Sequence, residues 1–208
     1  MQHFSISARC HGTGELGIAV STKFIAVGAL CVFVKNNVGA IASQAYINPQ
    51  LGISGLEYLA GGHSAQQTLE FLKSRDAGIE FRQLGVVDNK GGSAAFSGEE
   101  CDTWCGHLTG PNYALAGNML VGAETLEAIC ESFESDDSQP LSKRLLLALS
   151  AGEAAGGDKR GRQSAALKVY GAQDFPLLDL RVDEHTDPVG ELRRIYGVAE
   201  EILIPLIG

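Results

Sequence analysis

Apolar and polar residues alternate near the start of the chain, where residues 4–8 read Phe-Ser-Ile-Ser-Ala. Alternation with a period of two predicts a strand with one buried face. Three apolar runs follow, over residues 16–21, 29–34 and 38–44, with short turn-like segments between them. Four strands in quick succession favour an antiparallel sheet over parallel strands joined by helices.

The pattern then changes to one typical of helices. Ser64 and Gln67 have the spacing of a capping box, which predicts that a helix begins there and continues to about Ser74. We interpret residues 98–118 as an ordered loop. The other predicted elements are a hairpin at 82–88 and 93–97, helices at 124–133 and 141–151, strands at 163–170 and 177–182, and a last helix that Asp187 and Pro188 open. This order predicts an α+β fold in one domain over residues 1–208.

Charge narrows the class of partner. The 208 residues include 16 Lys and Arg against 25 Asp and Glu, a formal net charge of −9. This balance disfavours nucleic acid and anionic membrane surfaces as partners. We expect a small-molecule or peptide substrate, and a homodimer formed through a symmetric patch.

Five scattered cysteines, an odd number, suit a reducing compartment, and no run is long and apolar enough to span a membrane. We therefore expect a cytoplasmic protein. Cys101, Cys105 and His107 lack the spacing of a zinc site, so we expect no metal. The sequence has no nucleotide-binding glycine motif, and we expect no cofactor.

The segment richest in candidate chemistry is residues 154–166, which lies between a predicted helix and a predicted strand. Asp158, Arg160, Gln163 and Ser164 stand there beside glycines. Glycines allow backbone N–H groups to face an anion, and an arginine can hold a carboxylate in a bidentate pair. A solvated turn with a glycine helix cap has the same pattern, and both interpretations stay open.

Two other polar groups lie at strand ends. Ser43, Gln44 and Asn48 offer a hydroxyl and two amides where a predicted strand gives way to a loop. Arg82 and Gln83 open the next predicted strand. The sequence alone favours strand-end capping for the first group and an exposed strand end for the second, with substrate binding as the alternative for both.

Seven motifs, in order along almost the whole chain, resemble one bacterial family, domain of unknown function 1028, which is grouped with the N-terminal nucleophile (Ntn) hydrolases. The most specific is A-G-E-A-A-G-G-D-K-R-G-R-Q-S-A-A-L at residues 151–167. The others are F-S-I-x-A-R at 4–9, T-G-E-L-G-I-A-V at 13–20, V-G-A-I-A-S-Q-A-Y-x-N-P at 38–49, R-Q-L-G-V-V-D at 82–88, A-G-N-M-L at 116–120 and L-R-V-D-E-H-T-D-P-V at 180–189. The resemblance implies a four-layer αββα sandwich, with two antiparallel sheets face to face and helices outside. It also implies amide-bond chemistry.

The mechanism of Ntn hydrolases requires a terminal Thr, Ser or Cys, whose free α-amine accepts the proton. Family members can have Thr where this chain has His3, and the chain begins Met1-Gln2-His3. Neither Gln2 nor His3 is a hydroxyl or thiol nucleophile. Exposing Ser5 would require removal of four residues, which cuts into the first predicted strand, and exposing Cys10 would remove the strand. The usual mechanism therefore does not follow from this sequence.

Three hypotheses remain. In the first, the chain hydrolyses an amide or peptide bond in a small carboxylate-bearing substrate. Its reactive candidates are Ser43, Asp158 and Ser164, and Arg160 anchors the carboxylate, with Gln44 or Asn48 binding the oxyanion. Arg82, Gln83 and Gln163 are further substrate-binding candidates. The second is ring-amide chemistry like that of the cyclohydrolases of this fold, and the third is a scaffold that binds a small ligand or peptide without turnover.

Overall fold

The computed structural model describes residues 3–102 and 104–207, and its strands form two antiparallel sheets. Sheet A has six strands, which are, in spatial order, β10 (Pro176–Val182), β9 (Ser164–Tyr170), β2 (Leu16–Thr22), β1 (His3–Arg9), β8 (Tyr113–Asn118) and β7 (Cys105–Gly110). Sheet B has four, which are β3 (Val32–Lys35), β4 (Gly39–Ala45), β5 (Arg82–Asp88) and β6 (Ser93–Ser97).

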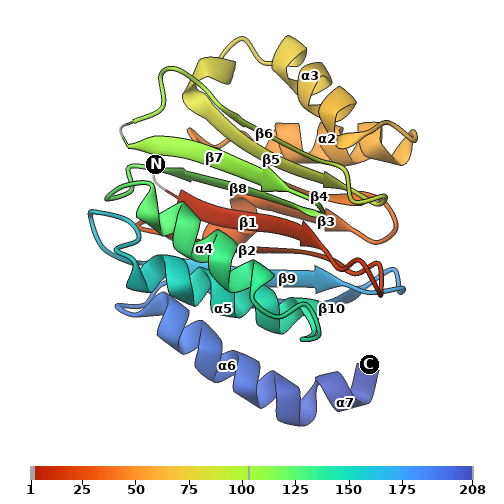
Figure 1. Cartoon of the computed structure of the whole chain (residues 1–208), viewed down its shortest axis with the longest axis vertical. Helices are drawn as coiled ribbons and strands as arrows, with labels where there is room; N and C mark the ends of the chain where they lie inside the picture. The colour runs from red at the N-terminus through yellow and green to blue at the C-terminus, as the bar shows by residue number, and fades with distance from the viewer. Residues whose placement is uncertain (1–2, 103, 208) are drawn as a thin grey trace.

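The helices cover the outer faces of the two sheets, so the molecule has four layers in the order αββα (Figure 1). Sheet B is covered by α2 (Pro49–Ala60) and α3 (Ala65–Arg75), and sheet A by α4 (Glu124–Glu134), α5 (Leu141–Ala154) and α6 (Pro188–Ile202). Short helices complete the chain: α1 (Val27–Leu30), a 3₁₀ turn (Ile79–Phe81) and α7 (Ile204–Ile207). The α+β class and the αββα sandwich expected from the sequence are confirmed.

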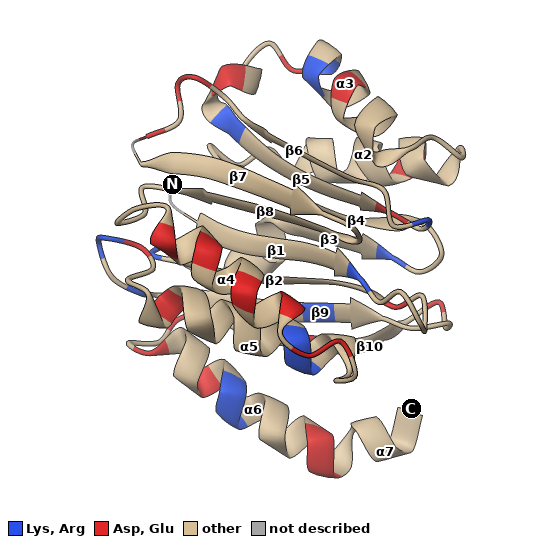
Figure 2. Ribbon diagram, viewed as in Figure 1, with Lys and Arg blue, Asp and Glu red and all other residues tan. Residues whose placement is uncertain are grey.

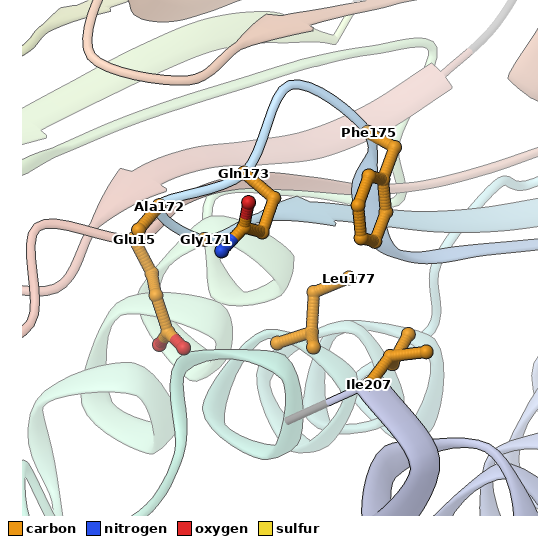
Figure 3. A pocket seen from close by; sticks show the side chains of 7 residues that line it. All are labelled: Glu15, Gly171, Ala172, Gln173, Phe175, Leu177 and Ile207. Carbon is orange, nitrogen blue, oxygen red and sulfur yellow. The ribbon is translucent and has the colours of Figure 1, made fainter.

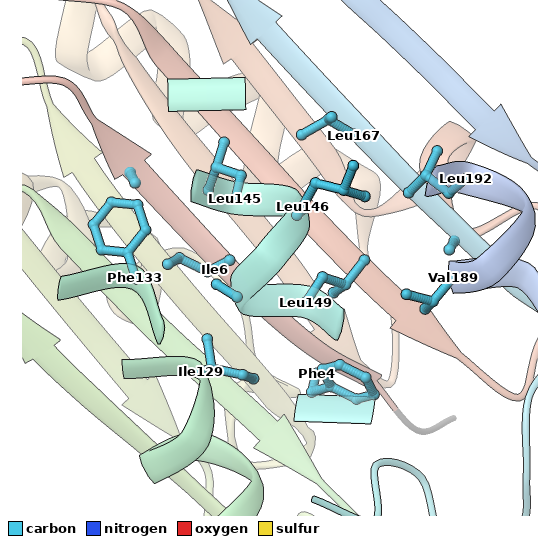
Figure 4. Packing of buried hydrophobic residues seen from close by; sticks show 14 of the residues in the cluster. Phe4, Ile6, Ile129, Phe133, Leu145, Leu146, Leu149, Leu167, Val189 and Leu192 are labelled. Carbon is cyan, nitrogen blue, oxygen red and sulfur yellow. The ribbon is translucent and has the colours of Figure 1, made fainter. Parts of the chain in front are cut away.

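Each of the three interfaces between layers has its own apolar core, which follows from the alternation along the strands. On β1, Phe4 and Ile6 face α4 and α5, where they pack with Ile129 and Leu149 (Figure 4). Ser5, between them in sequence, faces sheet B instead. The second core lies between the sheets and the third between sheet B and its helices.

Three sequence-based predictions differ from the structure. The strand predicted at residues 29–34 begins only at Val32, because α1 takes up residues 27–30. The loop predicted at 98–118 contains β7 and β8. Helix α2 was not predicted, since Gly52 and Gly55 weaken its helical pattern.

No helix in the described part of the chain has the length and apolar character needed to cross a membrane.

Candidate functional site

One end of the sandwich, which we call the β1 end, gathers strand ends from both sheets. In sheet A, β1 begins with His3 beside Asn118, the last residue of β8. In sheet B, β4 ends with Ala45 beside Arg82, the first residue of β5. The start of β1, the end of β6 and the loop from α5 to β9 all lie at this end (Figure 1).

Four buried polar side chains join the two sheets at the β1 end. The hydroxyl of Ser5 donates to Oε1 of Gln44 at 2.6 Å, and Nε2 of Gln44 donates to Oε1 of Gln83 at 3.1 Å. Nδ2 of Asn118 donates to the same Gln83 oxygen at 2.7 Å. None of the four is more than 1% exposed. Because an unpaired buried amide is costly, these hydrogen bonds are what make a polar cluster tolerable between the sheets.

Gln83 extends this cluster to the edge strands. Its Nε2 lies 2.8 Å from the carbonyl oxygen of Gly117 and 3.1 Å from that of Gly106. Nε2 also donates to Oγ of Ser97 at 2.8 Å, and Nδ1 of His107 lies 3.0 Å from that hydroxyl. Partial desolvation of its ring lowers the pKa of His107 below the usual value, although much of the side chain is exposed, and this favours a neutral imidazole at pH 7. We call the six side chains of Ser5, Gln44, Gln83, Ser97, His107 and Asn118 the polar chain.

The backbone turns sharply after two members of the polar chain. Ala45 follows Gln44 with a φ of 67°, and Met119 follows Asn118 with a φ of 51°. Non-glycine residues rarely adopt this left-handed conformation, at a cost of order 1 kcal/mol each. Such strain clusters at functional sites, so these two residues support a site at the β1 end.

A small cavity of about 60 Å³ opens beside the polar chain, and Asn118, Ala45 and Cys101 are among its lining residues. Burial raises the pKa of the Cys101 thiol to about 11. The thiol is therefore protonated at neutral pH, and we exclude Cys101 as an activated nucleophile.

The loop from α5 to β9 carries the glycine- and arginine-rich motif, and its cations stand out at this end of the molecule (Figure 2). Asp158 is buried and accepts from the backbone N–H of Lys23 at 3.0 Å and of Arg160 at 2.8 Å. Its carboxylate also forms an ion pair with the Arg160 guanidinium at 3.3 Å. Asp158 thus fixes the loop conformation and positions Arg160, whose side chain is 40% exposed.

Glycine is required within this loop, since Gly156 has a φ of 120°. Arg162, in the same loop, forms an ion pair with Glu153 of α5 at 2.7 Å, and burial raises the pKa of that glutamate.

Ser164 and Gln163 lie where this loop enters β9. The buried Ser164 hydroxyl donates to the carbonyl of Phe24 and accepts from the N–H of Val27 at 3.1 Å, so it anchors the start of α1. The backbone N–H of Gln163 donates to the carbonyl of Thr22 at 2.9 Å. The predicted catalytic role of Ser164 and the predicted binding role of Gln163 stay predictions.

Ser43, Asn48 and Arg82 lie on the other side of sheet B. The Ser43 hydroxyl donates to the carbonyl of Asn48, and the Asn48 side chain caps α2 through the N–H of Gln50 at 3.2 Å. Arg82 forms an ion pair with Asp76 at 2.9 Å. Burial acts to raise the pKa of Asp76, but hydrogen bonds from Arg82, Gly78 and Asn48 outweigh it and lower that pKa. These side chains already have hydrogen-bond or ion-pair partners within the fold. Their predicted site roles also stay predictions.

The N-terminal residues bear on the nucleophile. Met1 and Gln2 lie outside the described residues. Phe4 is fully buried in the core, and Ser5 is held by Gln44. Removing the first four residues to expose Ser5 would therefore cost both core packing and a strand pairing.

Among the described residues, no group of three or more His, Cys, Asp or Glu is placed to hold a metal ion. A cavity of about 230 Å³ lies far from the β1 end, between the turns that follow β1 and β9 and helix α7 (Figure 3). Its lining includes Glu15, Phe175 and Ile207 but no member of the polar chain. Another, of about 330 Å³, lies beside His63 and Asp88, also without a member of the polar chain. We therefore place the candidate site at the smaller cavity.

The structure thus joins Gln44 to Gln83 and Asp158 to Arg160, and it places both pairs at the β1 end. Sequence reasoning missed Asn118, Ser97 and the use of His107. The available signal was positional, because Asn118 and Ser97 each end a strand, next to a glycine. For Asn118 that signal was lost when residues 98–118 were interpreted as a loop, whereas Ser97 already ended a predicted strand and was not singled out.

The αββα layers and the buried amides at one end define the class of this protein, a sandwich with a polar site between its sheets. The chain belongs to the family of unknown function DUF1028, whose model matches residues 3–192. Protein SPO2555 from Silicibacter pomeroyi, of the same family, is 34% identical in a crystal structure, with a TM-score of 0.89 over 96% of this chain and 86% of that one.

A more remote likeness is to Anbu, the ancestral beta-subunit, from Yersinia bercovieri. It is 12% identical, with a TM-score of 0.43 over 99% of this chain and 98% of the other. No protein of curated function matches the chain.

Proposed function

We propose that this protein hydrolyses an amide or peptide bond in a small substrate that carries a carboxylate, and that the reaction takes place at the β1 end. The observation that carries the proposal is the fully buried set of Ser5, Gln44, Gln83 and Asn118 between the sheets. A polar cluster in an otherwise aliphatic core needs a reason, because apolar residues of similar size would pack there without exacting hydrogen bonds.

Carboxamides suit an amide substrate, since each offers both donors and acceptors. Asn118 lines the cavity, and one of its two amide hydrogens is directed to Gln83. The other is our candidate donor to the substrate carbonyl, where it would stabilise the negative charge that develops on the oxygen during attack.

Arg160 is our candidate anchor for the substrate carboxylate. Asp158 holds it from one side, and its guanidinium remains partly exposed at the β1 end. A planar guanidinium can bind a carboxylate through two parallel hydrogen bonds. Ring-amide hydrolysis and binding without turnover would use the same two recognition elements. Turnover of a linear amide therefore separates our proposal from both alternatives.

The test compares two chromogenic anilides of similar length, glutaryl-p-nitroanilide, which ends in a carboxylate, and valeryl-p-nitroanilide, which does not. We expect Arg160→Ala to lower kcat/KM for the glutaryl compound by about tenfold or more, as expected for one charge-assisted pair. It should leave the valeryl compound nearly unchanged. Lys35→Ala removes an exposed cation from the opposite end of sheet B and is the matched control.

Equal losses for both anilides in Arg160→Ala would contradict carboxylate recognition by this residue. If neither anilide is turned over but glutarate binds and Arg160→Ala abolishes that binding, the protein is a binding scaffold. Unchanged turnover in Asn118→Ala would contradict the assignment of the β1 end.

A further inference from the structure

The carbonyl oxygens around Gln83 fix the direction of its hydrogen bond to Ser97. The carbonyl oxygens of Gly117 and Gly106 can only accept, so the Gln83 atom facing them is its amide nitrogen. An amide nitrogen can only donate, so Ser97 Oγ accepts from Gln83 at 2.8 Å. The hydroxyl's own hydrogen is then free to point elsewhere.

Nδ1 of His107 is the partner that can receive that hydrogen. It lies 3.0 Å from Ser97 Oγ, within the range in which a base takes a proton from a nucleophile. Partial desolvation of the ring favours the neutral imidazole, and the tautomer with its proton on Nε2 presents an acceptor at Nδ1. The Gln83 amide also faces the oxygen on which negative charge would develop as the proton leaves.

We propose that Ser97 and His107 are a nucleophile and general base at the β1 end, which would give this protein an internal nucleophile in place of a terminal one. The inference rests on the proposed function for its substrate, and on the hydrogen-bond geometry for the pair itself. Ser97 is partly exposed and His107 is exposed, so a reagent can reach both.

The reaction balances without a further reactant. Ser97 Oγ bonds to the substrate carbonyl carbon as its proton passes to Nδ1 of His107. The carbon–nitrogen bond breaks, and the amine leaves with that proton. Water then attacks the acyl ester, His107 takes one of its protons, and the proton returns to Ser97 Oγ as the acid is released.

A serine-reactive fluorophosphonate tests the pair directly. Ser97 Oγ would displace fluoride at phosphorus and give a stable adduct, which mass spectrometry locates. We expect one adduct per chain at Ser97, no adduct there in Ser97→Ala, and labelling at least about 100-fold slower in His107→Gln.

Ser93→Ala is the matched control. Ser93 lies on the same strand as Ser97, but its hydroxyl donates to the carbonyl of Gly110 at 2.8 Å and so lacks a basic partner. This variant should label at the wild-type rate. Melting temperatures of all variants, each changed at a partly or fully exposed position, confirm that they are folded.

Labelling that is no faster than that of an exposed serine, or that His107→Gln leaves unchanged, would overturn the inference. Its failure is distinguishable from failure of the proposed function. Labelling at Ser97 with no turnover of either anilide would leave the pair intact and contradict the substrate class. Turnover of the anilides that is retained in Ser97→Ala would support the proposed substrate class and contradict the Ser97–His107 pair.

Discussion

At the residue scale, Gln83 does more than any other side chain to connect the two sheets. It is fully buried and accepts from Gln44 and Asn118. The two hydrogens of its amide nitrogen are shared among three acceptors, which are Ser97 Oγ and two backbone carbonyls. A glutamine on a strand is ordinarily half-exposed, so this position is specified by its partners and not by strand propensity.

Replacing Gln83 with methionine keeps the length of the side chain and removes all of its hydrogen bonds. Several buried polar atoms would be left without a partner, and we expect a loss of about 2–4 kcal/mol in the free energy of unfolding. Urea titration followed by circular dichroism measures it. Gln66→Met, on the exposed face of α3 with one bond to Glu70, should change stability by less than about 0.5 kcal/mol. Similar small effects from both variants would show that the buried network contributes little.

The same residue shows how far sequence reasoning reaches. Gln83 and Gln44 were singled out because they lie at strand ends, and the structure brings them into contact. Their shared partner Asn118 could not be found, because the contact spans 35 residues and depends on which strand of sheet A lies opposite β5. Sequence alone does not report pairings between separate sheets.

At the element scale, strands with clear alternation were predictable and glycine-rich elements were not. The alternation of β1 predicted its apolar face, but the polar face is also buried, because sheet B packs against it. Helix α2 was missed because Gly52 and Gly55 are poor helix formers, yet both are where the helix meets sheet B. A β-carbon at Gly52 would collide with the ring of Phe33, so close packing overrides helix propensity there.

This conflict gives a prediction with opposite signs for the same substitution. Gly197→Ala, in α6, adds a methyl group with nothing within 4 Å and should stabilise the protein by about 0.5–1 kcal/mol. Gly52→Ala should destabilise it by about 1–3 kcal/mol, because Phe33 must move. Thermal unfolding of both variants measures the difference. Stabilisation by both would mean that α2 does not pack on β3 as closely as described.

At the scale of the whole molecule, the two sheets enclose an aliphatic core along most of their length and a polar cluster at the β1 end. The loop from α5 to β9, which carries Asp158 and Arg160, lies at the same end. Asp158 forms a β-bridge there with Leu120, just beyond β8. The fold class followed from alternation and the family resemblance. The site did not, because its members come from both sheets and from segments more than 100 residues apart in the sequence.

We propose that an internal hydroxyl at the β1 end, that of Ser97, carries out acyl transfer. The most direct measurement is peptide mass mapping of the protein quenched with acid during turnover of an activated glutaryl ester, glutaryl p-nitrophenyl ester. We expect one glutaryl group per chain, on the peptide that contains Ser97, and none on that peptide in His107→Gln. A glutaryl group on a new N-terminus at Ser5, or product formation with no acylated peptide, would contradict the account.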